Sequence, residues 1–295
     1  MKRILSLLMI MALCFSITAC GSKSDAGAND VDDAKESAAP EATVSESLTL
    51  KEALEKENPQ IWFITKELAG RNTKAGNILV FKDNTLAWYE INKINEYEEV
   101  ESLGTLEDYY SLSTEDAIAL AEKKYKEVYE SYYGKLDEIA AEIEGGSMDD
   151  FFEDRYPEEQ KQFFYETRDA IKAAGIPVVK PYEYRLLAKL DDTGNGTKVM
   201  AASSKKDYAL TYKGKIIDVA WPFEHYFETE GGEEGQEVQL GFGRGIPSFE
   251  VYDTYYGGYE FVNDRGTTFY IITKCGPNTT FSLDPPGTEG VEFIK

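Results

Sequence analysis

Residues 77–90 have the sequence NILVFKDNTLAWYE, and this stretch decides the central part of the fold. Two runs rich in aliphatic and aromatic side chains, residues 77–81 and 85–89, flank Lys82-Asp83-Asn84. Asp and Asn tolerate the left-handed backbone of a tight turn, and such a turn between two strand-like runs is typical of a β-hairpin. The stretch therefore predicts two adjacent antiparallel strands.

The sequence before the hairpin predicts a short helix followed by another strand. Thr49 and Glu52 have the spacing of a capping box, in which each side chain bonds the other residue's backbone N–H at a helix start. The helix is expected to end at Asn58-Pro59, because the residue before a proline disfavours helical backbone. Residues 61–65, IWFIT, then predict a strand.

The sequence after the hairpin changes to a helical period. Ser113 is a favoured N-cap residue, and acids follow it in the first turn, where the helix dipole stabilises them. Gly145-Gly146 is expected to end this helix, and a second helix from about Pro157 to Gly175 completes an αα-hairpin. The apolar positions of the first helix are Ile118, Ala121, Tyr125, Val128, Tyr129, Tyr132, Leu136, Ile139, Ala140 and Ile143. Their helical spacing predicts one stripe that packs on the sheet, with a partner helix or a dimer seam as the alternative.

From Pro181 onward the sequence has the period of two that is typical of strands. Turn-forming residues separate these strands, for example at 191–196, 257–258 and 263–266. The predicted strands are residues 184–190, 197–202, 208–212, 215–221, 237–240, 248–252, 259–262, 268–273, 280–283 and 291–294. This succession of short strands favours a β-sandwich or barrel.

Together these elements predict an α+β protein. Residues 48–179 are expected to form an α+β domain with the β-hairpin and the αα-hairpin, and residues 180–295 a separate antiparallel β-sandwich-like domain. Residues 20–47 contain several acids and no aromatic residue, so they predict a disordered acidic tether with a reach of roughly 28 Å.

The N-terminal residues have the features of an export signal. Lys2 and Arg3 form a positive start, an uncharged apolar run follows, and Ile17-Thr18-Ala19-Cys20 closes it. This tetrapeptide resembles the lipobox of bacterial lipoproteins. The resemblance implies that residues 1–19 are removed as a lipoprotein signal peptide and that the Cys20 thiol carries the lipid. An ordinary signal peptide with a chance cysteine, or an uncleaved anchor, is the alternative.

The same resemblance implies a location. An acylated Cys20 would anchor the protein in the lipid bilayer, at the outer face of the bacterial cytoplasmic membrane. The hairpin sequence VFKDNTLAWYE, residues 80–90, also resembles a pattern in surface lipoproteins of Gram-positive bacteria, and it implies no activity.

The composition limits the partners. The chain of 295 residues has 31 lysine and arginine residues against 54 acids, and its formal net charge of −23 becomes about −25 without Lys2 and Arg3. Such a charge repels phosphate backbones and anionic lipid head groups, so no nucleic acid is expected as a partner. Neutral glycans, cationic peptides and metal ions are less disfavoured.

Few residues with catalytic or metal-binding chemistry are present. Among the 3 cysteines, Cys14 lies in the signal and Cys20 takes the lipid, so Cys275 is left unpaired and is expected to be buried at a strand end. His225 is the single histidine, which excludes a multi-histidine metal site. Neither a cofactor nor a metal site is predicted. The acid-rich loop at 191–196 is expected to be a solvated surface, with calcium binding as the alternative.

Two further motifs match catalytic or phosphate-binding patterns only in part. Residues 203–206, SSKK, have the S-x-x-K spacing of a serine activated by a lysine, but they fall in an expected loop and the companion motifs are absent. Residues 241–245, GFGRG, are glycine-rich, but no helix follows that would receive a phosphate, so a bend between strands is expected. No catalytic residue is therefore predicted.

Aromatic side chains are the one excess that suggests a ligand. The chain has 20 tyrosines, and Tyr255, Tyr256 and Tyr259 surround Gly257-Gly258. Tyrosine offers a flat apolar face and a hydroxyl, which suits a sugar ring or a peptide. These three tyrosines are therefore the predicted ligand-binding residues of an exposed loop, and packing at the rim of a β-sandwich is the alternative.

The sequence thus predicts a membrane-anchored extracytoplasmic protein of the cell envelope that binds a glycan or peptide ligand or has a structural role. A carboxylate-dependent hydrolase of cell-wall or environmental glycans or peptides is the alternative, because 54 acids make a catalytic pair available wherever a cleft exists. A two-lobed solute receptor is less favoured, since the sequence lacks alternating β and α units.

Overall fold

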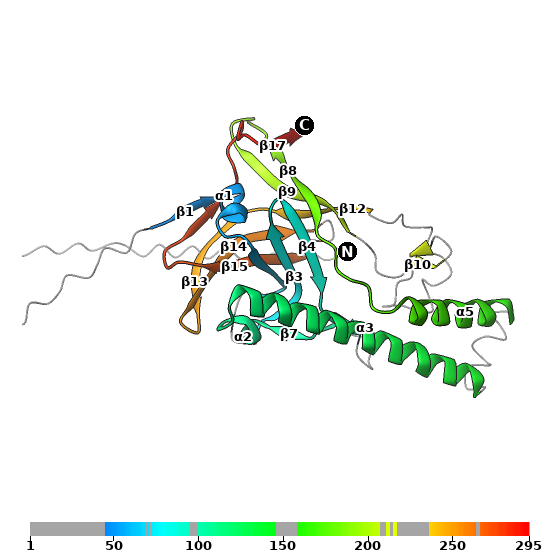
Figure 1. Cartoon of the computed structure of the whole chain (residues 1–295). Coiled ribbons are helices and arrows are strands. Elements are labelled where there is room, and N and C mark those ends of the chain that lie inside the picture. The colour runs from blue at the N-terminus through cyan, green and yellow to red at the C-terminus, as the bar shows by residue number, and fades with distance from the viewer. Residues whose placement is uncertain are drawn as a thin grey trace, which may run out of the picture. The chain divides into compact units, whose positions relative to one another are not determined.

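The computed structural model describes residues 45–68, 70, 72–94, 100–145, 158–206, 211–212, 215–216, 236–263 and 266–294 (Figure 1). Ala42–Lys295 form one compact unit, to which every element below belongs. The unit is a mixture of helices and strands, and most of its strands lie in one large, mainly antiparallel sheet.

The described elements follow one another in this order. The helices are α1 (Leu50–Glu55), α2 (Leu106–Tyr109), α3 (Thr114–Glu144) and α5 (Glu158–Ala174). The strands before α5 are β1 (Ser47–Thr49), β2 (Gln60–Thr65), β3 (Lys74–Lys82), β4 (Thr85–Glu90), β5 (Asn92–Ile94), β6 (Val100–Ser102) and β7 (Gly104–Thr105). The strands after α5 are β8 (Tyr182–Leu190), β9 (Thr197–Lys206), β10 (Thr211–Tyr212), β11 (Lys215–Ile216), β12 (Gln236–Phe242), β13 (Gly245–Val251), β14 (Thr254–Val262), β15 (Thr268–Cys275), β16 (Thr280–Ser282) and β17 (Val291–Ile294).

The hairpin predicted from residues 77–90 lies at the centre of the sheet. β3 and β4 pair antiparallel from Asn77 opposite Glu90 to Lys82 opposite Thr85. Asp83 and Asn84 form the two-residue turn with φ angles of 47° and 59°, which is the left-handed conformation that these residue types tolerate. β2 pairs with the other edge of β3, so the strand predicted before the hairpin is its neighbour.

The large sheet curls round on itself. Its strand order is β12-β9-β8-β4-β3-β2-β15-β14-β13, and its first and last strands are consecutive in the sequence. Gly243 and Arg244 join them, and the Gly243 N–H donates to the Glu260 carbonyl at 2.8 Å while the Glu260 N–H donates to the Arg244 carbonyl at 2.9 Å. The expected bend at residues 241–245 is confirmed, and it joins the two ends of the sheet.

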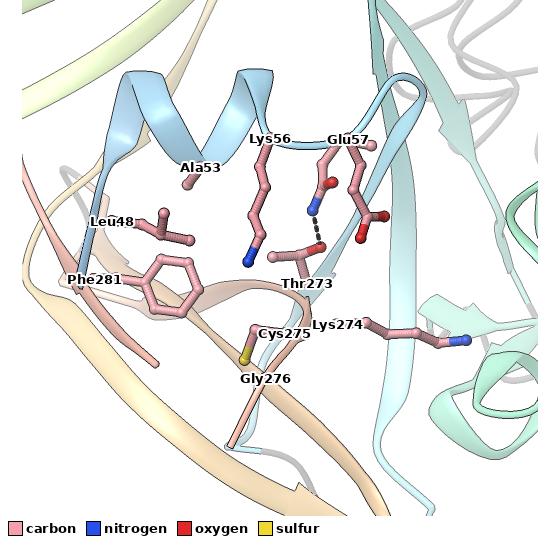
Figure 2. A pocket seen from close by; sticks show the side chains of 10 residues that line it. Leu48, Ala53, Lys56, Glu57, Thr273, Lys274, Cys275, Gly276 and Phe281 are labelled. Carbon is pink, nitrogen blue, oxygen red and sulfur yellow. Dashed lines mark hydrogen bonds between the residues drawn. The ribbon is translucent and has the colours of Figure 1, made fainter. Parts of the chain in front are cut away.

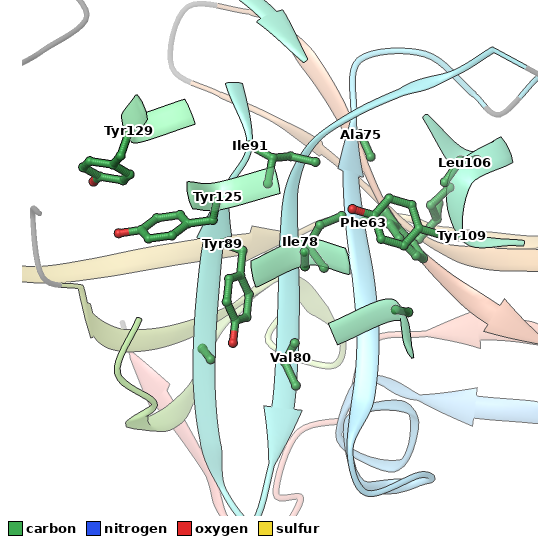
Figure 3. Close-up of a cluster of buried hydrophobic side chains, with 14 of the residues drawn as sticks. Phe63, Ala75, Ile78, Val80, Tyr89, Ile91, Leu106, Tyr109, Tyr125 and Tyr129 are labelled. Carbon is green, nitrogen blue, oxygen red and sulfur yellow. The ribbon is translucent and has the colours of Figure 1, made fainter. Parts of the chain in front are cut away.

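The curled sheet has an inner core and an outer core. Side chains alternate along each strand, so Trp62 faces the inner core with residues of β8, β9 and β12, whereas Phe63 faces the outer core. Helix α3 covers the outer face, where Tyr125 packs on Tyr89 with ring centroids 6.2 Å apart (Figure 3). The central strands β2, β3, β4 and β15 are therefore covered on both faces, which gives a helix layer, a central sheet layer and a second sheet layer.

The apolar stripe of α3 packs against other parts of this chain. Ser113 caps α3 by accepting from the Asp116 N–H. The buried residues of α3 are Ala117, Ala121, Tyr125, Val128, Tyr129, Leu136, Ile139, Ala140 and Ile143. The first of these pack on the sheet and the last pack with Phe164 and Ile171 of α5 in the same outer core. The stripe is thus covered by this chain itself.

The predicted division into two domains at residues 179 and 180 is wrong for the described chain. β2 pairs with β15 and β4 pairs with β8, so strands from both predicted domains form one hydrogen-bonded sheet. The strands β8, β9 and β12 do not have a core of their own, because their apolar side chains share the inner core with Trp62, Leu79 and Phe81 of the N-terminal strands. The physical reason is that β8, β9 and β12 need the inner face of the hairpin to bury their own apolar side chains.

Three local predictions also need correction. The folded unit begins before residue 48, because Ser47–Thr49 form β1 and pair in parallel with β16. Residues 203–206 lie in strand β9, and no loop forms there. Gly257-Gly258 lies inside β14, and the turn falls earlier, at Tyr252 and Asp253, whose φ angles are 54° and 57°.

Candidate functional site

A cavity lies between α1, β1, β16 and the end of β15 and is the candidate site (Figure 2). Its volume is about 140 Å³. The residues that line it are Leu48, Ala53, Lys56, Glu57, Gln60, Thr273, Lys274, Cys275, Gly276 and Phe281. Apolar side chains of Leu48, Ala53 and Phe281 form one side, and the polar groups lie toward β2 and β15 (Figure 2).

Two sets of hydrogen bonds hold α1 over this cavity. The predicted capping box is present, because the Thr49 N–H donates to the Glu52 carboxylate and the Glu52 N–H donates to Thr49 Oγ1. The carboxylate of Asp284, which is 1% exposed, accepts from the Lys51 N–H at 2.9 Å. The start of α1 is thereby fixed to the segment after β16, and the helix forms one wall of the cavity.

Gln60 and Thr273 are buried polar residues that line the cavity. The Gln60 side-chain Nε2 donates to Thr273 Oγ1 at 2.7 Å, and the Thr273 hydroxyl donates in turn to the Ile61 carbonyl at 2.7 Å. Because the hydroxyl proton is used on Ile61, Thr273 can only accept from Gln60, and this fixes which end of the amide faces it. Gln60 is 4% exposed, and its Oε1 has no hydrogen-bond partner within the described residues.

The charged groups of the cavity carry both signs. Lys56 forms an ion pair with Glu46, and its amine points into the cavity (Figure 2). Glu57 is the one carboxylate among the described residues that line the cavity. The Lys274 side chain points away from it (Figure 2), and its Nζ donates to the Leu112 carbonyl at 3.1 Å. Burial lowers the pKa of Lys274, because water no longer solvates the full ammonium charge.

Cys275 faces the cavity as a free thiol (Figure 2). Cys275 lies at a strand end as expected, since it is the last residue of β15, but it is only partly buried, whereas a buried residue was expected. Burial raises the pKa of the Cys275 thiol to about 11, and a hydrogen bond with Thr279 offsets this only in part. The thiolate is the nucleophile in cysteine chemistry, so this residue is poorly suited to attack a substrate at neutral pH.

The raised pKa predicts slow alkylation of Cys275. In a chain with Cys14→Ala and Cys20→Ala, we expect iodoacetamide at pH 8 to modify native Cys275 at least about tenfold more slowly than the same thiol in urea, because the thiolate fraction is smaller. The native rate should keep rising to about pH 11. Mass spectrometry of timed aliquots measures both rates. Equal rates at pH 8 would show that the thiol is not perturbed.

The three predicted tyrosines do not form a binding surface. Tyr256 and Tyr259 are each 0% exposed. Tyr256 lies in the outer core and Tyr259 in the inner core, so the two rings are on opposite faces of the sheet. Tyr255 is partly exposed, and its hydroxyl donates to the Glu250 carboxylate at 3.2 Å. The prediction of an exposed tyrosine loop is therefore wrong, because residues 255–259 belong to strand β14, whose Tyr256 and Tyr259 are buried on opposite faces of the sheet.

The other candidate residues fall into ordinary structural roles or outside the described chain. The Thr193 hydroxyl and N–H donate to the Asp191 carboxylate at 2.7 Å and 2.9 Å, and these hydrogen bonds within the turn lower the pKa of Asp191. No group of three or more potential metal ligands occurs in the described part of the chain. Cys20 and His225 lie outside the described residues.

The S-x-x-K serines point to opposite sides of β9 and bond locally. The Ser203 hydroxyl donates to the Glu237 carboxylate, and the Ser204 hydroxyl contacts the carbonyls of Tyr182 and Glu183. Within the described chain neither hydroxyl is bonded to a lysine amine, so the motif has no activated serine.

Comparison of the chain with protein-family models, with curated proteins and with solved structures gives no match. Among the described residues, no helix is both long and apolar enough to cross a membrane.

Sequence reasoning missed the α1 cavity. Gln60 and Thr273 are 213 residues apart, and no local pattern relates them. The one available signal was a glutamine at the first position of an otherwise apolar strand, directly after Asn58-Pro59. A polar residue there is unremarkable until the pairing of β2 with β15 buries it.

Proposed function

We propose that the protein is a lipid-anchored binding protein at the outer face of the bacterial cytoplasmic membrane and that it takes a small ligand into the α1 cavity. The observation that carries this proposal is Gln60, which lines the cavity and whose buried Oε1 has no hydrogen-bond partner among the described residues. An unpaired buried acceptor costs about 1–3 kcal/mol, and a bound donor would remove this cost.

Binding is favoured over hydrolysis by the chemistry of the lining. Hydrolysis of glycosides requires two carboxyl groups that flank the bond to be broken, and Glu57 is the one acid among the described lining residues. The thiol of Cys275 has its pKa raised to about 11 by burial, so it is a weak nucleophile at neutral pH. The described lining would thus bind the ligand without a group that attacks it.

The glycan or peptide ligand that the tyrosines suggested needs another site. Pockets that enclose drug-sized ligands have volumes of roughly 300–1,000 Å³, and the α1 cavity has about 140 Å³. We therefore propose a small solute as the ligand. For the fold, we propose a single α+β unit in which α2, α3 and α5 contribute to the outer face of the sheet.

The anchor rests on Ile17-Thr18-Ala19-Cys20, the lipobox-like tetrapeptide. Each buried CH₂ of an acyl chain contributes about 0.8 kcal/mol to membrane binding, so two or three chains hold a protein stably. Cys20 supplies the thiol for the lipid, and the described fold begins at residue 45, which leaves the intervening chain as the connection between membrane and folded unit.

The Cys20→Ala variant tests the anchor. We expect it to lose fatty-acid labelling in cells and to be released to the medium or retained uncleaved, because no other residue of the lipobox can form the thioether. Cys14→Ala is the matched control, since it changes a cysteine in the apolar run and should keep the label. Metabolic labelling followed by fractionation measures the outcome. Persistent labelling of Cys20→Ala would refute the lipid anchor.

A thermal screen tests the binding function. A ligand that binds the folded state alone stabilises it by about 4.1 kcal/mol at a thousandfold excess over its Kd. Pools of small metabolites should therefore contain at least one that raises Tm, and a change of Lys56 to Met should reduce this shift because its amine faces the cavity. The exposed Lys123→Met serves as the control for the loss of a lysine. Absence of any Tm shift across the pools would count against a ligand in the cavity.

A further inference from the structure

We infer that the α1 cavity takes a small zwitterion of the class of free α-amino acids, an inference that rests on the proposed binding function. The geometry that points to it is one cavity lined by a buried acceptor, a carboxylate, an ammonium group and an apolar wall. Each part of such a ligand has a counterpart among Gln60, Glu57 and Lys56, which all line the same cavity.

The unpaired Gln60 Oε1 requires a hydrogen-bond donor on the ligand. Gln60 Oε1 can accept a hydrogen bond but cannot give one, and its orientation is fixed by the chain of bonds through Thr273 to Ile61. Glu57 adds a negative charge to the same lining. A hydroxyl would satisfy Gln60 alone, whereas an ammonium group would satisfy Gln60 and be attracted by Glu57 as well.

The Lys56 side favours an anionic group. A lysine ammonium has three donors, and Glu46 is its one carboxylate partner among the ion pairs of the described chain. The side chains of Lys56 and Glu46 are 36% and 37% exposed, and exposed ion pairs contribute little net stability. A ligand carboxylate can therefore share the ammonium of Lys56 at little cost to the fold.

The charges of the protein disfavour a ligand that carries only a positive or only a negative charge. The net charge of −23 repels a simple anion from the protein. Lys56, whose amine points into the cavity, disfavours a simple cation there. A zwitterion has no net charge, so it avoids both penalties and still pairs with groups of each sign.

The remaining walls set the size of the ligand. Leu48, Ala53 and Phe281 give an apolar surface on one side of the cavity (Figure 2). A cavity of about 140 Å³ leaves room for a short aliphatic side chain next to the charged groups. Alanine is therefore a suitable first probe, because it combines both charges with one methyl group.

The test is isothermal titration of the mature lipoprotein in detergent micelles with four probes of similar size. L-alanine carries both charges, propionate the carboxylate alone, ethylamine the ammonium alone, and glycerol only hydroxyls. We expect L-alanine to bind and propionate and ethylamine to bind at least about tenfold more weakly, because each lacks one charged contact. Equal affinity for L-alanine and either fragment would overturn the inference.

Two variants locate the binding in the cavity. Gln60→Leu and Lys56→Met should each weaken L-alanine at least about tenfold, while Gln162→Leu on α5 and Lys123→Met on α3 should leave it unchanged, since both control positions are exposed and lie on other elements. If Gln60→Leu fails to fold, Lys56→Met still tests the inference, because the Lys56 side chain is exposed enough to be dispensable for folding. Unchanged affinity in Lys56→Met would overturn the inference.

The outcomes separate this inference from the function it rests on. Binding of glycerol or ethylamine, but not of L-alanine, that is lost in Gln60→Leu would overturn the zwitterion while keeping the cavity as a ligand site. Failure of all four probes together with a negative metabolite screen would overturn the proposed function itself.

Discussion

Trp62→Ala is expected to lower the free energy of unfolding by about 3–5 kcal/mol, the range for removing a fully buried large aromatic side chain. Trp62 is 0% exposed and lies in the middle of the inner core. Its ring centroid is 6.3 Å from that of Phe242, 6.1 Å from that of Tyr259 and 6.3 Å from that of Phe281. These neighbours come from β12, β14 and β16, so one substitution opens the junction of four strands.

Urea unfolding followed by circular dichroism measures this loss without relying on tryptophan fluorescence. Trp88→Ala is the matched control, because Trp88 is only half-buried and lies at the edge of the same core, so a smaller loss is expected. Trp62→Phe provides a milder variant if the alanine variant does not fold. Trp62 Nε1 has no hydrogen-bond partner within the described chain, so the phenylalanine variant loses apolar contact alone. A loss below about 1 kcal/mol in Trp62→Ala would contradict the inner core as described.

Gly258→Ala is expected to have the second large effect, a loss of about 2–5 kcal/mol from backbone strain and overpacking together. The φ angle of Gly258 is 154°, which side chains of L-residues rarely adopt, and an added Cβ would lie 2.1 Å from the Ile271 carbonyl oxygen. That oxygen belongs to β15, the strand paired with β14 at this position. The two strands would have to separate where the sheet is covered on both faces.

Gly194→Ala separates the two causes of this loss. Gly194 has a φ of 73° in the exposed turn before β9, and an added Cβ would meet nothing within 4 Å. It should therefore lose only the conformational part, about 1–2 kcal/mol. Urea midpoints of both variants make the comparison. Equal losses would show that the close approach of Ile271 does not matter.

Local chemistry accounts for what could be predicted. The turn at Asp83 and Asn84, the capping box of Thr49 and Glu52, and the cap at Ser113 each depend on residues within a few positions of one another. The apolar stripe of α3 likewise follows from helical spacing, and the structure covers it with the sheet and with α5. Such features need no knowledge of distant partners.

Long-range pairing of strands accounts for the features that could not be predicted from the sequence. The sequence shows that Tyr256 and Tyr259 flank two glycines, but it does not show whether their side chains are exposed. Their exposure depends on the two layers that cover β14. The predicted domain boundary failed for the same reason, because the pairing of β2 with β15 joins residues from both ends of the unit. No periodicity within either half contains this information.

The sequence by itself determined the hairpin at residues 77–90, the caps at Thr49 and Ser113 and the apolar stripe of α3, because each of these depends on neighbouring residues. The tertiary structure alone decided which strands share the curled sheet and where the candidate site lies. The α1 cavity exists because α1 and β1 close over the point where β2 pairs with β15. That pairing brings Gln60 to Thr273, and Gln60 Oε1 is left buried with no hydrogen-bond partner among the described residues, which is the feature that suggests a ligand.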